Sequence, residues 1–367
     1  MLRSWSVAEV PLIAGVIAIV ALCSLFAWSR AEAQSLKKLD VNVFPAGFIL
    51  PLWVAQDKGL FARNGLEVRL IATPNSVQQM TGLIDGRFDI AMTAVDNVIA
   101  YMEGQGEAPT RSTPDIVALM GSSSGFLSLI AAPEIKSLAD LRGTTLSVDA
   151  MTTGYAFTLR KMLEKAGLKD GDYTLTRVGG MKERYEALIE RKQAGSLLVP
   201  PFTLAALDRQ FNELTTALAL LGHFQGGVAA ARRAWTAEHR DEVIGFIRGN
   251  IAALDWLYDA GNKREALQIF QAHLPGTSAT VAEKSYGVLL HPSSGFPRKA
   301  EIDVEGVKTV MEIRSQYAEP RKTLTDPSRY YDLSYYRAAL SNLFEQPCSR
   351  SASFPASTSR TAVSSRA

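Results

Sequence analysis

The sequence predicts an α/β protein of two domains, each a mostly parallel sheet flanked by helices. Strand and helix patterns alternate along residues 41–199. Such alternation builds parallel sheets, because each helix returns the chain to the same end of the sheet. A glycine- and serine-rich segment at 121–125 interrupts the pattern, and a glycine pair, Gly226 and Gly227, follows later. Both segments suit crossings between domains, because glycine tolerates the backbone changes that a hinge requires.

The first predicted unit is a strand, a helix and a second strand. Residues 41–44 and 66–70 have strand patterns, and the second alternates as a strand with one covered face. Apolar residues at helical spacing and two turn glycines define the helix between them. These positions are Ile49, Leu52 and Trp53, followed by Gly59 and Gly65.

The rest of the first domain continues this alternation. Ser76 is the predicted N-cap of a helix that stops at Gly86. Asp96 or Asn97 is the predicted cap of the next helix, because both can accept a bond from a free backbone N–H. The strands predicted around these helices cover 88–92 and 115–120.

The second domain is predicted to begin with a strand at 126–131. Ser137 and Asp140 then have the spacing of a capping box, in which each side chain bonds the backbone of the other. The remaining elements are strands at 144–148, 173–178 and 196–199, and helices at 153–167 and 182–192. Beyond residue 224, apolar stripes predict only helices that pack on the first domain. The stripes are Val243, Ile247, Ile251 and Leu254, then Val307, Val310, Met311 and Arg314.

Three short motifs near the start carry a family resemblance. They read Pro-Leu-Trp-Val-Ala at 51–55, Lys-Gly-Leu-Phe at 58–61 and Gly-Leu-Glu-Val at 65–68. The chain resembles, over about residues 38–343, the nitrate/sulfonate/taurine-binding family of ABC-importer substrate-binding proteins, which also includes binders of thiamine-pyrimidine precursors. The resemblance implies the type 2 periplasmic binding protein fold, with a ligand cleft between the two domains. It places domain one at 36–125 and 224–345, and domain two at 126–223.

The resemblance also implies a function. A solute-binding component of an ABC import system captures a small organic molecule between its domains and delivers it to a permease in the inner membrane. We therefore expect a periplasmic monomer with a small-molecule ligand. Two alternatives stay open: a ligand sensor tethered to the membrane by an uncleaved anchor, and an enzyme of the pyrimidine-precursor type.

Several activities lack the residues that they need. The related pyrimidine-precursor enzymes carry a cysteine-rich motif, whereas this chain has only Cys23 and Cys348. The four histidines show no close metal-ligand pairing. Residues 121–125 formally fit a Gly-x-Ser-x-Gly elbow at Ser123, but they lead into a predicted domain crossing instead of a helix. The net charge of +2 gives no indication of nucleic-acid binding. We therefore predict a binding protein without a metal or cofactor.

The two ends of the chain have their own signals. Residues 1–33 combine Arg3, a long apolar run and Ala31-Glu32-Ala33, which is the pattern of a secretory signal peptide with cleavage before Gln34. The apolar run approaches the length of a membrane span, so the uncleaved anchor is the alternative. Residues 346–367 are rich in Ser, Ala and Arg without apolar periodicity, which predicts a disordered tail.

Candidate ligand contacts lie where predicted strands end and helices begin. In open α/β sheets these ends meet at one edge, where helix N-termini present unpaired N–H groups. Helix capping alone would equally explain the hydroxyl and amide residues among them, and core packing would explain the aromatic ones. The candidates are Phe48, Thr73, Asn75, Ser76, Thr93, Asp96, Asn97, Phe126, Asp149, Thr152, Thr153, Gly154, Tyr155, Phe202 and Gln225.

The charges of these loops suggest the class of ligand. Asp96 and Asp149 each lie at a strand-to-helix junction, while the candidate loops contain no Lys or Arg. A site for a strong anion usually adds a cation to its helix N-termini. We therefore predict a neutral or amine-bearing organic solute, with helix capping as the alternative role of both acids.

Overall fold

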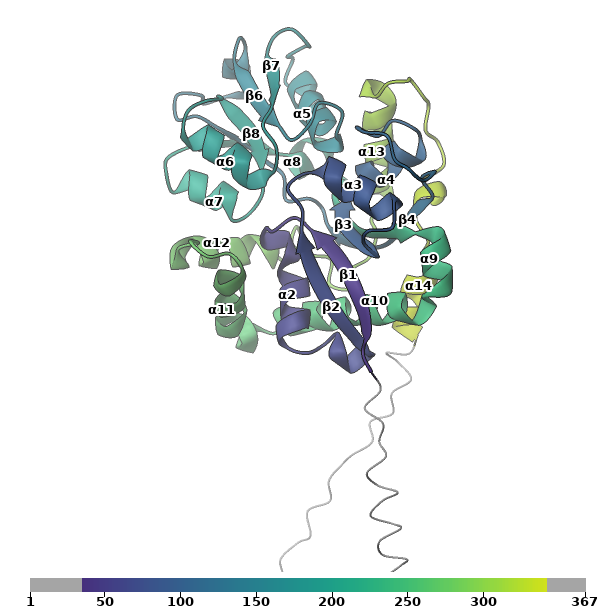
Figure 1. Cartoon of the computed structure of the whole chain (residues 1–367). Helices are drawn as coiled ribbons and strands as arrows, with labels where there is room; N and C mark the ends of the chain where they lie inside the picture. Colours follow the sequence, from purple (N-terminus) through teal and green to yellow (C-terminus); the bar gives the residue numbers. More distant parts are fainter. Residues whose placement is uncertain (1–34, 342–367) are drawn as a thin grey trace, which may run out of the picture. The chain divides into compact units, whose positions relative to one another are not determined.

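The computed structural model describes residues 35–341, so the predicted signal segment and tail lie outside the described residues. The described strands form two sheets of five (Figure 1). The first has the order β2-β1-β3-β10-β4 and the second the order β7-β6-β8-β5-β9. The first consists of β1 (Lys37–Val43), β2 (Leu66–Ala72), β3 (Ile90–Ala94), β4 (Ile116–Ser123) and β10 (Gly227–Arg232). The second consists of β5 (Ser128–Ala131), β6 (Thr145–Val148), β7 (Thr174–Arg177), β8 (Gly195–Leu198) and β9 (Asn212–Thr216).

Both sheets are mixed, and each contains one antiparallel strand. These strands, β5 and β10, each follow one of the two glycine-containing crossings between the sheets. In the first sheet β1 and β3 are parallel, with Val41 beside Ile90, whereas β10 runs antiparallel to both β3 and β4. In the second sheet β6 is parallel to β7 and β8, whereas β5 runs antiparallel to β8 and β9. The predicted α/β class with two sheets is confirmed. The residue bounds predicted for the two domains stay a prediction.

Helices cover both sheets (Figure 1). Before β10 they are α2 (Leu50–Asp57), α3 (Ser76–Ile84), α4 (Val95–Met102), α5 (Gly154–Lys165), α6 (Met181–Ile189), α7 (Phe202–Leu207) and α8 (Ala217–Leu221). After β10 they are α9 (Arg233–Glu238), α10 (Arg240–Leu257), α11 (Lys263–His273), α12 (Ala279–Leu289), α13 (Val304–Tyr317) and α14 (Ser334–Ser341).

The strand β10 corrects the prediction that the chain beyond residue 224 is entirely helical. Its sequence is Gly-Val-Ala-Ala-Ala-Arg, and alanine has a low preference for strands. The strand forms because it fills the gap between β3 and β4, where its small side chains are almost fully buried. Tertiary pairing therefore overrides local preference at this position.

Two predicted helix caps were wrong and one was confirmed. The N-cap of α3 is Asn75, whose side chain accepts a bond from the backbone of Gln78, so Ser76 is already inside the helix. The N-cap of α4 is Ala94, because the side chains of Asp96 and Asn97 are bonded elsewhere. The capping box is present before the short 3-10 helix Leu138–Leu141.

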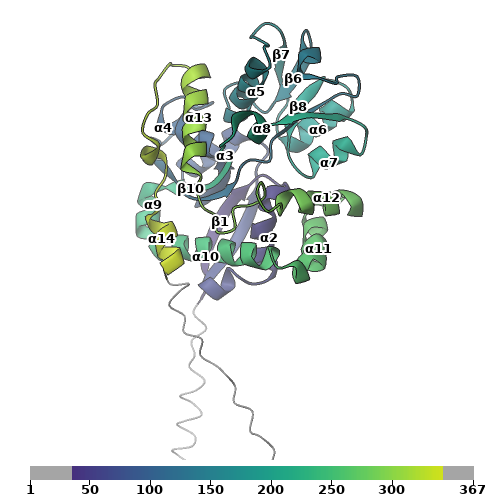
Figure 2. The same ribbon diagram turned by 180° about the vertical axis from the view of Figure 1, so that it is seen from behind.

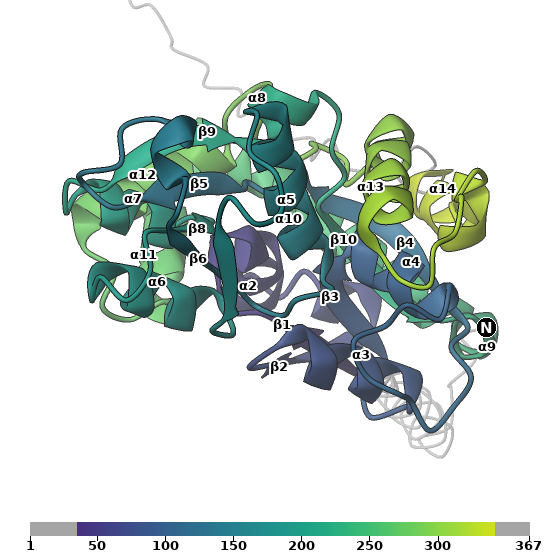
Figure 3. The same cartoon turned by 90° about the horizontal axis from the view of Figure 1, so that it is seen from above.

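The long helix α10 packs on the first sheet beside α2 and α14 (Figure 2). The ring of Phe246 in α10 stacks on that of Phe61, with 5.5 Å between centroids and an interplanar angle of 3°. Both rings are buried in one apolar cluster that includes β1 and α2. Helix α13 contacts both α4 and α5, which belong to different sheets, and the view from above shows it next to α4 (Figure 3).

Replacing Phe246 by Ala should destabilise the protein by about 3–5 kcal/mol, because the change leaves a cavity under α2 that the neighbouring helices cannot fill. Urea unfolding followed by circular dichroism measures the difference. As a control, Val288→Ala removes a side chain that is 38% exposed and should cost no more than about 0.5 kcal/mol. Equal effects of the two variants would contradict this account of the core.

Candidate ligand-binding site

A pocket of about 60 Å³ lies between the carboxyl ends of strands from both sheets. Phe44, Ala94 and Ser123 line it at the ends of β1, β3 and β4, and Asp149 lines it directly after β6. This is the position at which open α/β sheets bind ligands. Because it receives residues from both sheets, the pocket depends on their being held together.

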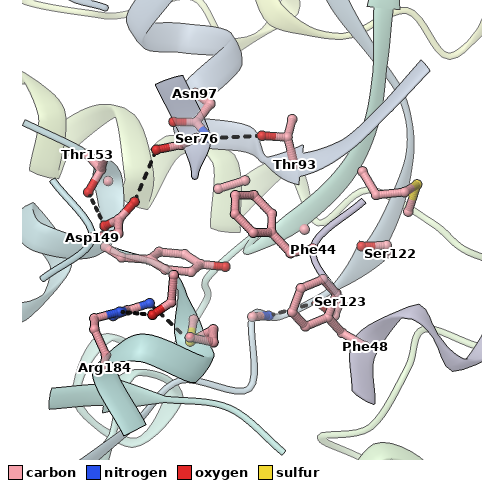
Figure 4. Close-up of a pocket in the computed structure, with 18 residues that line it drawn as sticks. Phe44, Phe48, Ser76, Thr93, Asn97, Ser122, Ser123, Asp149, Thr153 and Arg184 are labelled. Atoms are coloured by element: carbon pink, nitrogen blue, oxygen red, sulfur yellow. Dashed lines mark hydrogen bonds between the residues drawn. The ribbon is translucent and has the colours of Figure 1, made fainter. Parts of the chain in front are cut away.

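Eight predicted residues line this pocket. They are Phe48, Ser76, Thr93, Asn97, Asp149, Thr153, Gly154 and Tyr155. Figure 4 shows Phe44 and Phe48 on one side of the pocket, with Asp149 and Arg184 on the other. The pocket therefore has an aromatic side and a charged side.

Four helices begin at the pocket. Ser76, Ala94, Gly154 and Met181 lie at the N-termini of α3, α4, α5 and α6, and all four line the cavity. A helix N-terminus carries a partial positive charge and unpaired N–H groups. Only α3 has a side-chain N-cap bond among these four. Their combined field favours an anionic group in the pocket.

The carboxylate of Asp149 is held by two hydroxyl groups, one from each side of the pocket (Figure 4). Thr153 Oγ1 donates to Asp149 Oδ1 at 2.7 Å, and Ser76 Oγ donates to Asp149 Oδ2 at 3.1 Å. Ser76 belongs to α3 on the first sheet, so this bond joins the two sheets. The N-cap of α5 is Thr153, without a side-chain cap bond, so the predicted helix capping by Asp149 was wrong and its partners are hydroxyl groups instead.

A guanidinium group, that of Arg184 in α6, also lines the pocket and is 2% exposed. Arg184 Nη1 donates to the Leu197 carbonyl at 3.0 Å, Nε to the Gly180 carbonyl at 3.4 Å, and Nη2 lies 3.0 Å from the Met181 sulfur. Burial lowers the pKa of Arg184 from its usual value, and the nearby Asp149 carboxylate opposes that shift. Arginine remains charged in proteins, so a buried cation faces the pocket.

The Asp149 and Arg184 charges have opposite effects on the pKa of the Tyr155 phenol. Burial raises the pKa of Tyr155 above its usual value, Asp149 raises it further, and Arg184 opposes the change. The hydroxyl therefore stays protonated at neutral pH and can donate a hydrogen bond. Elsewhere in the lining of the pocket, Asn97 Nδ2 of α4 donates to Thr93 Oγ1 of β3 at 2.9 Å (Figure 4).

A second and larger cavity of about 740 Å³ adjoins the pocket, and we call it the outer groove. It shares Phe44, Gly180 and Met181 with the pocket. The predicted residues Thr73 and Phe202 line the outer groove instead of the pocket. A ligand longer than the pocket would therefore extend past these shared residues into the groove.

Five predicted residues lie outside both cavities and have other bonding partners. Asn75 caps α3, and Phe126 packs edge-on against Phe296. Both the backbone N–H and the hydroxyl of Thr152 donate to Glu107. The buried Gln225 amide donates to the carbonyls of Ser123 and Gly227 at the chain crossing.

The fifth of these residues, Asp96, forms a buried ion pair with Arg314 of α13. Arg314 Nε and Nη2 donate to the two Asp96 oxygens at 2.6 and 2.5 Å, and the two side chains are 0% and 6% exposed. The guanidinium also donates to the Thr152 carbonyl at 3.1 Å and lies 5.1 Å from the centre of the Phe157 ring. Asp96 is thus part of a contact between the sheets and does not face the pocket.

Sequence reasoning missed Arg184 because it considered only the loops between strands and helices. Arg184 lies one turn inside α6, and the junction before α6 was not among the candidate loops. The pair Gly179-Gly180 after β7 was a signal for that junction. The prediction that the site lacks a cation was wrong, because Arg184 lines the pocket. The other missed pocket residues are Phe44, Met92, Ala94, Ser122, Ser123, Gly125, Gly180, Met181 and Gly227.

Comparison with known proteins identifies the family. Residues 48–261 match the family model described as NMT1/THI5 like, so the chain belongs to this family. No curated protein matches the chain at a significant level of sequence similarity.

Many solved structures share the fold. The periplasmic nitrate-binding protein NrtA from Synechocystis PCC 6803 is 13% identical, with a TM-score of 0.71 over 84% of this chain and 89% of NrtA. The periplasmic aliphatic sulphonate-binding protein SsuA from Escherichia coli is 17% identical, with a TM-score of 0.64 over 82% and 94%. A zinc-bound ligand-binding component of an ABC-type import system from Staphylococcus aureus is 14% identical, with a TM-score of 0.67 over 83% and 99%.

These three proteins are binding proteins with a two-domain fold like that of this chain. At such low identity the similarity establishes the fold alone. Within residues 35–341, no helix combines the length and the apolar character needed to cross a membrane.

Replacing Arg314 by Met should destabilise the protein by about 3–5 kcal/mol, because the buried Asp96 carboxylate loses its partner. The double variant Asp96→Leu with Arg314→Met should recover much of this loss, since no charge is then left buried. Arg142→Met provides a matched control: Arg142 pairs with Asp172 but is 61% exposed, and its loss should cost less than about 1 kcal/mol. If urea unfolding shows the same change for Arg314→Met and Arg142→Met, the buried pair does not stabilise the fold.

Proposed function

We propose that this protein is the extracytoplasmic solute-binding component of an ABC import system. It captures a small organic solute between its two sheets and delivers it to a membrane permease. The observation that carries this proposal is the pocket itself, which takes its walls from both sheets and its polar groups from four helix N-termini. Membership of the NMT1/THI5-like family and the shared fold of three binding proteins support it.

The contacts across the pocket explain how such capture works. Ser76 bonds Asp149, the Gly47 N–H bonds the Pro200 carbonyl at 3.0 Å, and Arg314 reaches the Thr152 carbonyl, so each contact joins the two sheets. A solute seated between the sheets adds its own bonds to this set. Binding therefore favours the arrangement in which the sheets are together, which is the form that a permease would recognise.

Binding without chemical conversion is the simpler activity for this site. Ser76 and Thr153 donate their hydroxyl hydrogens to Asp149, and these bonds hold the carboxylate in place as a binding group. Within the part of the chain that the structure describes, no group of three or more His, Cys, Asp or Glu side chains is placed to hold a metal ion. We propose that the protein acts as a monomer in the periplasm.

A thermal-shift screen tests the proposed function directly. The panel should contain nitrate, sulfonates, amines, amino acids, aromatic acids and pyrimidines. A solute present at about 100 times its Kd adds roughly 2.7 kcal/mol to the free energy of unfolding, which gives a clear rise in melting temperature. If no compound in so broad a panel stabilises the protein, the proposal of solute capture fails.

Phe48→Ala should lower the affinity for the solute identified in that screen by about tenfold, because roughly 1.4 kcal/mol of aromatic contact is lost from the wall of the pocket. Isothermal titration calorimetry measures the change. Phe202→Ala serves as the matched control, since Phe202 lines only the outer groove. A solute that fills only the pocket should bind this control as it binds the unmodified protein. A larger loss for Phe202→Ala than for Phe48→Ala would place the solute in the outer groove instead.

A further inference from the structure

The loop between α4 and β4 of the first sheet reaches the start of α5 on the second sheet. The Glu107 carboxylate in this loop accepts hydrogen bonds from the backbone N–H of Thr152, at 3.3 Å, and from its hydroxyl. Its other oxygen, Oε1, lies 3.8 Å from Nη1 of Arg177 at the end of β7. Glu107 therefore joins the first sheet to two elements of the second.

The base of this loop is fixed on the side of the first sheet. Tyr330 donates its hydroxyl hydrogen to Glu103 Oε1 at 2.9 Å, and Gln105 Nε2 donates to the Pro320 carbonyl at 2.7 Å. Both partners lie in the segment that follows α13. Because these bonds hold the loop just before Glu107, its carboxylate is presented to the second sheet from a defined position.

The start of α5 favours a negative charge at this place. Thr153, the N-cap of α5, has no side-chain cap bond. A helix N-terminus carries a partial positive charge and free N–H groups, both of which favour a nearby carboxylate. Glu107 supplies that carboxylate from the opposite sheet, so the interaction is made only while the two sheets are together.

Glu107 combines partial burial with a place outside the apolar core, since its side chain is 18% exposed. The ion pair of Lys284 in α12 with Asp208 after α7 is 49% and 32% exposed, and such exposed pairs contribute little in water. Arg314 is fully buried beside Asp96, so its loss destabilises the fold itself. Glu107 is therefore a charged contact whose removal can separate the sheets without unfolding either of them.

The segment that Glu107 holds also carries polar groups of the pocket. Asp149 and Thr153, on either side of Thr152, line the pocket, and Figure 4 shows the hydrogen bond between them. A small cavity of about 10 Å³ adjoins the pocket, shares Ser76 and Thr153 with it, and is also lined by Glu107. The position of Asp149 relative to Ser76 therefore depends on the contact that Glu107 makes with Thr152.

We propose that Glu107 is a positioning residue, a latch that holds the two sheets together over the pocket by binding Thr152. Glu107 does not line the pocket, so it acts by raising the fraction of molecules in which both walls of the pocket are in place. The apparent Kd of a solute is its intrinsic Kd divided by that fraction, so a stronger latch gives tighter binding. This consequence for affinity rests on the proposed function of solute capture, whereas the latch itself is a property of the chain.

A backbone hydrogen bond elsewhere reports whether the sheets are together. The N–H of Gly47, in the turn before α2, donates to the Pro200 carbonyl after β8 at 3.0 Å and so joins the two sheets. Neither residue bonds Glu107 in the described part of the chain. The N–H of Thr73 provides an internal reference, because it donates to the Val43 carbonyl within the first sheet at 2.9 Å.

The test is amide hydrogen exchange followed by NMR, on the full chain without added solute. Glu107→Ala removes the latch, so the Gly47 amide should exchange at least about tenfold faster while the Thr73 amide keeps its rate. Glu107→Gln retains one acceptor atom and should give a smaller increase. Glu134→Ala is the matched control, since Glu134 forms an exposed ion pair with Arg191 on the second sheet, and it should leave both amides unchanged.

A second variant tests the coupling from the other side, because coupling between two contacts is reciprocal. Gly47→Ala places a Cβ atom 2.8 Å from the Pro200 carbonyl oxygen, which forces this contact apart. The Thr152 amide, whose acceptor is Glu107, should then exchange at least about tenfold faster.

The outcomes are distinct. An unchanged Gly47 amide in Glu107→Ala would show that Glu107 orders only its own loop, and the latch would be overturned. Equal acceleration of the Gly47 and Thr73 amides would also overturn it, because Glu107 would then stabilise the first sheet and not the contact between the sheets. If Glu107→Ala does not fold, Glu107→Gln and Gly47→Ala decide by the same comparison. These measurements need no solute, so a failed solute screen contradicts the proposed function alone and unchanged exchange contradicts the latch alone.

Discussion

The buried ion pair of Arg314 and Asp96 is the contact on which the arrangement of the pocket depends. A guanidinium presents its donors in a fixed plane, so the groups that it bonds must sit at fixed positions around it. Arg314 bonds Asp96 in α4 and the Thr152 carbonyl just before α5, which brings the starts of two helices from different sheets together. Gly154 follows at the point of closest approach, where a Cβ atom would lie 2.3 Å from that of Asp96. The close approach between the starts of α4 and α5 therefore depends on both the ion pair and the glycine.

Local patterns were sufficient to predict most of the fold. The alternation of strands and helices from residue 41 to 199 was confirmed, because amphipathic spacing reflects which face of each element is buried. The failures were the strands β9 and β10, which were not predicted, and the caps of α3 and α4. The alanines of β10 form a strand because they pair with both β3 and β4, and Asp96 does not cap α4 because Arg314 binds it. Both outcomes depend on residues that are far apart in the sequence, which no local pattern records.

The candidate site was predicted in part for the same reason. Residues at the junctions between strands and helices reached the pocket, since topology alone brings those junctions to one edge. The identity of the cation could not be found in this way. Arg184 lies one turn inside α6, and its side chain faces the pocket only because α6 begins at the cavity with Gly180. A search that extends one helical turn past each junction would have included it.

The protein contains two combinations of a buried arginine with an aspartate, and they differ in how the two side chains are bonded. Arg314 and Asp96 satisfy each other with two charge-assisted bonds, so their burial is stable without any ligand. Arg184 and Asp149 share one cavity but contact only neutral groups. Asp149 offsets part of the cost of burying Arg184 through its charge, although no ion pair joins the two side chains within residues 35–341. The stabilising pair fixes the starts of α4 and α5, and these helices in turn form the cavity in which the unpaired charges remain separate.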